Sequence, residues 1–135
     1  MASPARVDLV ARNDQDRSEA LAVRSFRFGI EAEVEEIIAY HLRRGDNKIR
    51  RQVKCGNGRV DIFDETTSEI IECKLIGDAD TIGAAIGQLQ RYRPYFFDPQ
   101  LAIGVPILWP SAKPMLEILD RSNIRLIEIA KGIGV

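Results

Sequence analysis

Apolar and polar side chains follow a helical period in three parts of the chain. Over residues 28–42, apolar side chains recur at three- and four-residue spacing, which predicts a helix with one buried face that ends at Gly45. A second helix is predicted to end at about Tyr92, before Pro94, and a short third helix lies between 111 and 119. The residues expected to cap their N-termini are Asp80 or Thr81 for the second helix and Ser111 for the third.

Alternating or continuous apolar runs between these helices predict five strands. They cover 48–54, 59–64, 70–75, 101–108 and 124–129. Asn57-Gly58 separates the first two strands and favours a tight hairpin turn, because these residue types tolerate a positive φ angle. The order αβββαβαβ predicts an α/β domain with a central mixed β-sheet flanked by helices. Residues 1–27 lack a comparable pattern and are expected to form an arm or irregular segment, which leaves 28–135 as the domain.

Composition excludes several classes of protein. The 135 residues include two cysteines and one histidine. No run approaches the ~18 apolar residues of a membrane helix, and the N-terminus lacks the apolar core of a signal peptide, so we expect a soluble, cytoplasmic protein with no membrane partner. Cys55 and Cys73 are too distant in sequence for a CxxC pair and are expected to be reduced thiols. With His41 as the only histidine, a zinc site has too few soft ligands.

Charge is distributed unevenly along a chain whose net charge is −1. Acidic residues are concentrated at Glu31, Glu33, Glu35 and Glu36. Basic residues are concentrated in 43–54 and around Tyr92: Arg43, Arg44, Lys48, Arg50, Arg51, Lys54, Arg91 and Arg93. Such a run is often only a solvated face, and the alternative is a surface that binds phosphates of nucleic acid.

Two carboxylates and one ammonium group are predicted to converge on neighbouring strands. Glu72 and Lys74 are two residues apart and share a face of their strand, and Asp61 can meet them from the adjacent strand. Hard oxygen ligands of this kind suit Mg²⁺, and the main-chain carbonyl of Cys73 could add a ligand. The alternative is a cross-strand ion pair, but charges inside an apolar strand are costly unless a site requires them.

Three segments, in chain order, resemble the motifs of the RecB-type PD-(D/E)XK nucleases. They are Gly58-Arg59-Val60-Asp61, Ile70-Ile71-Glu72-Cys73-Lys74 and Gly87-Gln88-Leu89-Gln90-Arg91-Tyr92, the last of which is similar to the QxxxY element. The likeness is nearest to the C-terminal nuclease domain of the NucS/EndoMS mismatch endonucleases and covers about 29–129. It implies a restriction-endonuclease-like fold.

The resemblance also implies roles for individual residues. Asp61 and Glu72 would bind the metal ion, Lys74 would be catalytic, and Gln88 and Tyr92 would position the substrate. An acid of the first helix often joins the metal ligands in such nucleases. On a helical wheel Glu31 lies nearest the apolar face, so we predict Glu31 for this role, with a solvated acid as the alternative. His41 falls on the same face and is expected to be a hydrogen-bonded core residue.

The sequence therefore predicts a DNA endonuclease that uses Mg²⁺ or Mn²⁺ and acts on structured or branched DNA in repair or recombination. The basic residues named above would contact DNA phosphates. Three alternatives stay open: a small homing or restriction-type endonuclease, a non-catalytic DNA-binding module on the same fold, and a structural domain with incidental ion pairs. Whether the protein forms a homodimer is also open.

Overall fold

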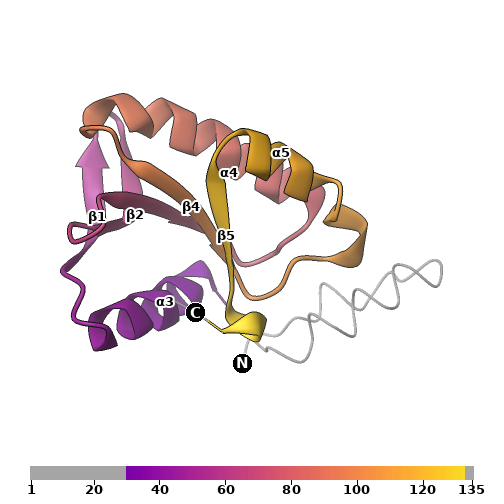
Figure 1. Ribbon diagram of the computed structural model, residues 1–135, viewed down its shortest axis with the longest axis horizontal. Helices are drawn as coiled ribbons and strands as arrows, with labels where there is room; N and C mark the ends of the chain where they lie inside the picture. Colours follow the sequence, from indigo (N-terminus) through magenta and orange to yellow (C-terminus); the bar gives the residue numbers. More distant parts are fainter. Residues whose placement is uncertain (1–29, 133–135) are drawn as a thin grey trace.

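A five-stranded mixed β-sheet with helices on both faces forms the domain in the computed structural model, which describes residues 30–132 (Figure 1). Helix α3 (Glu31–Arg44) covers one face, and α4 (Ala79–Tyr92) and α5 (Met115–Arg121) cover the other. The strands are β1 (Ile49–Cys55), β2 (Gly58–Asp64), β3 (Glu69–Cys73), β4 (Gln100–Val105) and β5 (Ile124–Glu128). The predicted element order is confirmed, and the predicted arm at 1–27 lies outside the described residues.

The sheet combines an antiparallel and a parallel half. Its strand order follows the sequence, from β1 to β5. Strands β1, β2 and β3 pair antiparallel, whereas β3, β4 and β5 pair parallel. Parallel neighbours require crossover connections, and α4 and α5 supply them on the same face. The central position of β3 thus joins a local hairpin to the parallel half.

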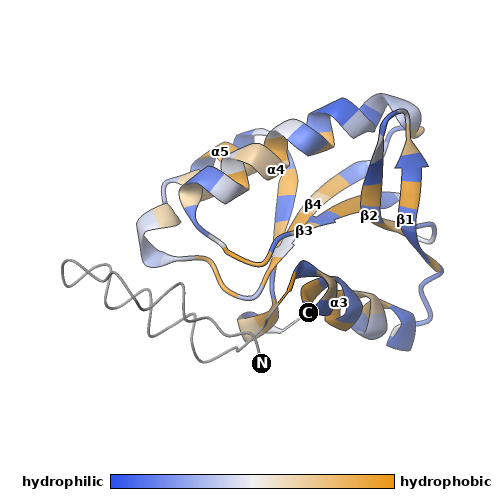
Figure 2. Cartoon of the chain, turned by 180° about the vertical axis from the view of Figure 1, so that it is seen from behind, coloured by the Kyte–Doolittle hydropathy of each residue, from blue (hydrophilic) through white to orange (hydrophobic). Residues whose placement is uncertain are grey.

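Two apolar clusters, one on each face of the sheet, form the core. The first packs α4 and α5 onto residues such as Ile70 and Ile103, and the second packs α3 onto Ile71 and Ala102. Hydrophobic residues accordingly recur along the strands, whereas the helices combine hydrophobic and hydrophilic residues (Figure 2). A methyl group added at Gly104 would overlap the Ile38 side chain of α3, so glycine leaves the room that Ile38 occupies over β4.

Several local predictions differ from the structure. The N-cap of α4 is Asp78, whose Oδ1 accepts a hydrogen bond from the Thr81 amide at 3.0 Å, so the prediction of Asp80 or Thr81 was wrong. Ser111 caps no α-helix, because it lies in a 3₁₀ turn before Pro114 and α5 starts only at Met115.

The hairpin turn and the first helix also differ in detail. The turn between β1 and β2 is formed by Gly56 and Asn57, one residue earlier than predicted, and Gly56 has the positive φ angle of 59°. His41 is exposed, so the prediction that it belongs to the core was wrong. The buried face of α3 includes Ile38, Ala39 and Leu42, and His41 lies outside it. Gly45 caps the helix as predicted.

Cys55 and Cys73 are both free and buried. Within 30–132, no helix is both long and apolar enough to cross a membrane.

Candidate active site

Backbone pairing of β2 is interrupted on both sides at Asp61. Pairing with β1 skips this position, and pairing with β3 begins only at Ile62. In the gap, Asp61 Oδ2 accepts the Cys73 amide hydrogen at 2.8 Å, and Glu72 Oε1 accepts the Asp61 amide hydrogen at 3.4 Å. Side-chain carboxylates thus replace backbone carbonyls as acceptors between β2 and β3, which brings Asp61 and Glu72 together.

These two carboxylates are costly to ionise in their surroundings. Glu72 is only 3% exposed. Burial, followed by the charge of Asp61, raises the pKa of Glu72 to about 8, and the nearby Lys74 ammonium opposes this in part. Burial also raises the pKa of Asp61, and the charge of Glu35 adds to the effect. Such a pair is stabilised in its ionised form by a cation bound between the carboxylates.

Helix α3 places two more acids near Asp61. Glu31 is exposed in the first turn, whereas Glu35, one turn later, is only 6% exposed. The Oε2 atom of Glu35 lies 2.7 Å from Arg51 Nε, and its Oε1 accepts a hydrogen bond from Gln52 Nε2 at 2.8 Å. The prediction that Glu31 lies nearest the apolar face of this helix was therefore wrong: the buried acid is Glu35, whose contacts with Arg51 and Gln52 the helical pattern does not show.

The donor set fits a cation that shares its ligands with water and substrate. Among residues 30–132, no three acidic, cysteine or histidine side chains converge as a preformed metal cage. Mg²⁺ commonly uses one or two protein carboxylates, with waters and phosphate oxygens completing its octahedron. Asp61 and Glu72 meet that requirement. Metal-binding roles for Glu31 and for the Cys73 carbonyl stay predictions.

Helix α4 carries Gln88 and Tyr92, the two residues predicted to position the substrate. The Oε1 atom of Gln88 is buried without a hydrogen-bond partner among the described residues. The ring of Tyr92 lies against Gly58, at a distance that leaves no room for a side chain there. Burial and the charge of Glu72 raise the pKa of the Tyr92 hydroxyl, which places this side chain within electrostatic reach of the site.

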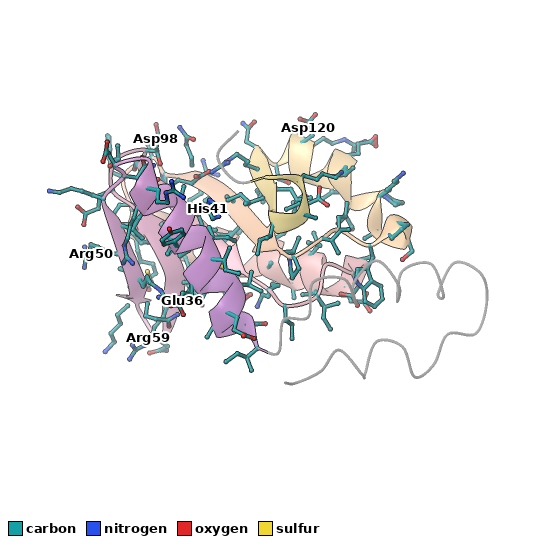
Figure 3. All side chains as sticks on the ribbon, turned by 90° about the horizontal axis from the view of Figure 1, so that it is seen from below. Glu36, His41, Arg50, Arg59, Asp98 and Asp120 are labelled. Atoms are coloured by element: carbon teal, nitrogen blue, oxygen red, sulfur yellow. The ribbon has the colours of Figure 1, made fainter. Side chains whose placement is uncertain are left out.

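The predicted phosphate-binding residues do not form one strip. Arg43 and Arg44 lie in the last turn of α3, at the other end of the helix from Glu31. Lys54 lies opposite Arg59 in the register of β1 and β2, near the hairpin tip. Arg50 and Arg59 lie on the hairpin at the outer edge of the molecule (Figure 3). Arg51 faces Glu35 and Arg50 lies 3.6 Å from Glu65, so these two cations already have acidic neighbours.

In the part of the chain that the structure describes, cavities lie on the surface near the C-terminal end of α4. One of about 550 Å³ lies between the hairpin and the end of α4; its lining residues are Cys55, Asn57, Gly58, Arg91, Tyr92 and Tyr95. A larger one of about 670 Å³ lies at the start of β4 and β5, where Arg93 joins Arg121 and Arg125. The smaller cavity is the better candidate for a substrate-binding cavity, because it is lined by Tyr92, which lies within electrostatic reach of Glu72.

Comparison with solved structures shows what this fold is similar to. The crystal structure of a repair endonuclease from Pyrococcus abyssi matches with a TM-score of 0.54 at 19% sequence identity. The match covers 73% of this chain and 46% of that chain, so the domain corresponds to less than half of that protein. No protein-family profile matches the chain, and no curated protein matches it. The likeness and the sheet topology define an α/β, restriction-endonuclease-like fold.

Proposed function

We propose that this domain is a metal-dependent DNA endonuclease of the PD-(D/E)XK type. The observation that carries the proposal is the pair of carboxylates formed by the half-buried Asp61 and the buried Glu72, placed where the β2–β3 pairing opens. Two acids held side by side and partly withdrawn from water destabilise the protein unless a cation binds them. Similarity of the fold to a repair endonuclease supports DNA as the substrate.

The residues of the site would have different roles in phosphodiester hydrolysis. Asp61 and Glu72 would hold Mg²⁺ or Mn²⁺, with the Cys73 carbonyl and Glu31 as further ligands. When bound, the ion acts as a Lewis acid on phosphate oxygen and lowers the pKa of water. Lys74, close enough to affect Glu72, stabilises negative charge that develops on the phosphate.

Groups on α4 would orient the substrate. Gln88 retains an unused acceptor, which suits a water molecule or the amino group of a base. Tyr92 presents a hydroxyl four residues later on the same helix face. Exposed Arg91, which lines the smaller cavity, suits the phosphates of a bound strand, as does exposed Lys54 near the hairpin tip.

Cleavage of labelled DNA tests this function. Linear, flapped, mismatched and four-way-junction DNAs are incubated with the wild-type protein in Mg²⁺, in Mn²⁺ and in EDTA. We expect metal-dependent cleavage of at least one structured substrate, its loss in Asp61→Asn and Glu72→Gln, and retained DNA binding by both variants. Glu117→Gln, an exposed acid of α5, is the matched control and should cleave normally.

Other outcomes distinguish the alternatives. DNA binding by the wild-type protein without cleavage in either metal identifies a non-catalytic binding module. Preference for one linear sequence identifies a homing or restriction-type enzyme. Full activity in EDTA, or in either carboxylate variant, refutes the site.

A further inference from the structure

Gln52 has a backbone conformation that is unusual for its place in the structure. Its φ angle is 53°, in the left-handed region, although it lies inside strand β1 and is not glycine. The register of β1 and β2 is the same before and after this point, yet Gln52 and Asp61, which face each other, do not pair. The backbone distortion at Gln52 therefore lies directly opposite Asp61, the candidate metal ligand.

This distortion accompanies a change in the face that the hairpin buries. On one side of it, Ile49 and Ile62 pack against α3, and on the other side Cys55 and Val60 pack in the cluster beneath α4. A regular strand keeps alternate residues on one face, so the switch requires an irregular residue. Strained conformations of this kind persist where the surrounding structure enforces them, often at functional sites.

The side chain of Gln52 connects two acids. Its Nε2 donates to Glu35 Oε1 at 2.8 Å and to Asp61 Oδ1 at 3.3 Å. The other oxygen of Glu35 is bound by Arg51, and the other oxygen of Asp61 is bound by the Cys73 amide. Both oxygens of Asp61 are thus held by donors, one from each neighbouring strand.

We propose that Gln52 is a positioning residue for Asp61. By holding Oδ1 while Cys73 holds Oδ2, it fixes the plane of the carboxylate next to Glu72. The left-handed backbone directs the amide towards Asp61, and Glu35, anchored by Arg51, orients that amide in turn. The proposal rests on the proposed function, because the geometry of Asp61 matters to the reaction only if Asp61 binds the ion.

Gln52→Gly tests this role without adding strain. Glycine adopts a positive φ angle freely, which offsets the lost hydrogen bonds, so the melting temperature should stay within a few degrees of the wild type. Loss of a group that orients a metal ligand typically costs about 10- to 100-fold in metal affinity or activity. We expect a loss of that size in Mn²⁺ affinity, measured by calorimetry without DNA, and in single-turnover cleavage, with DNA affinity unchanged.

Ser68→Gly is the matched control. Ser68 also has a positive φ angle, 57°, but lies in the turn before β3. It should leave Mn²⁺ affinity and cleavage unchanged. A Gln52→Gly protein that binds Mn²⁺ and cleaves like the wild type overturns the positioning role while the proposed function stands. A wild-type protein that neither binds Mn²⁺ nor cleaves overturns both.

Discussion

Replacing Glu72 by glutamine should make the metal-free domain more stable at neutral pH while removing its activity. The folded-state pKa of Glu72 is raised from 4.5 to about 8, so the folded state holds its proton over a range in which the unfolded chain has lost it. Stability therefore falls as pH rises from about 4.5 to about 8, and the effect is absent below that range. Glutamine does not titrate, so the variant lacks this loss.

The expected magnitude follows from the separation of the two pKa values. Each unit of difference between the two pKa values corresponds to about 1.4 kcal/mol in the free energy of unfolding. Between pH 5 and pH 8 the wild-type protein should lose up to about 3 kcal/mol relative to Glu72→Gln. This is a large share of the roughly 5–15 kcal/mol that stabilises a typical domain. A buried amide without partners adds an offset that does not depend on pH, so the change in the difference is the informative quantity.

Urea denaturation of both proteins in EDTA, at half-unit intervals from pH 5 to pH 8, measures this difference. Glu69→Gln is the matched control, because Glu69 lies on the same strand with the same 3% exposure. Glu69 accepts two hydrogen bonds from Arg125, at 2.7 and 3.1 Å, so its replacement should destabilise the domain by at least about 1 kcal/mol. The same Glu→Gln substitution is thus expected to stabilise the metal-free domain at Glu72 and to destabilise it at Glu69.

A difference between wild type and Glu72→Gln that stays constant from pH 5 to pH 8 refutes the reasoning. Saturating Mn²⁺ provides a second check, since it should stabilise the wild type and reduce the advantage of the variant. An unchanged advantage in Mn²⁺ would show that the ion does not bind at Glu72.

Three further predictions concern separate parts of the domain. Lys74→Met should lower the single-turnover rate about 100-fold or more and leave the DNA dissociation constant nearly unchanged; an equal loss in both would make Lys74 a DNA-binding residue. Glu31→Gln should slow cleavage whereas Glu36→Gln, on the exposed face, should not; the reverse order would exclude Glu31 as a ligand. Gly104→Ala should lower the urea-derived stability by about 1–3 kcal/mol, because its methyl group overlaps the Ile38 side chain, and unchanged stability would show that Ile38 rotates away at little cost.

Periodicity predicted the elements well because most strands and helices carry apolar residues at regular spacing towards one of the two clusters. The cap of α4 shows where this information ends. Asp78, Asp80 and Thr81 are all competent caps by residue type. The choice of Asp78 depends on the bridge between Gly77 and Leu108, a contact between distant loops that fixes where the helix starts.

The candidate site was predictable to the same extent. Asp61 and Glu72 could be placed together because their strands are neighbours along the chain. The burial of Glu35 could not be predicted, because it depends on Arg51 and Gln52 reaching it from another element. The left-handed conformation of Gln52 could not be predicted either, because glutamine does not favour it. It accompanies the change in the face that β1 and β2 bury.

The ion pair between Glu69 and Arg125 has a consequence for the order of folding. Glu69 opens β3, and its partner lies on β5, 56 residues later and with β4 between the two strands. The β1–β2–β3 meander closes through local contacts and can form early. Glu69 of β3 nevertheless pairs with Arg125 only after β5 has joined the sheet. Chain segments that end before β5 should therefore remain partly unfolded, and the two halves of the sheet should gain full protection from hydrogen exchange together.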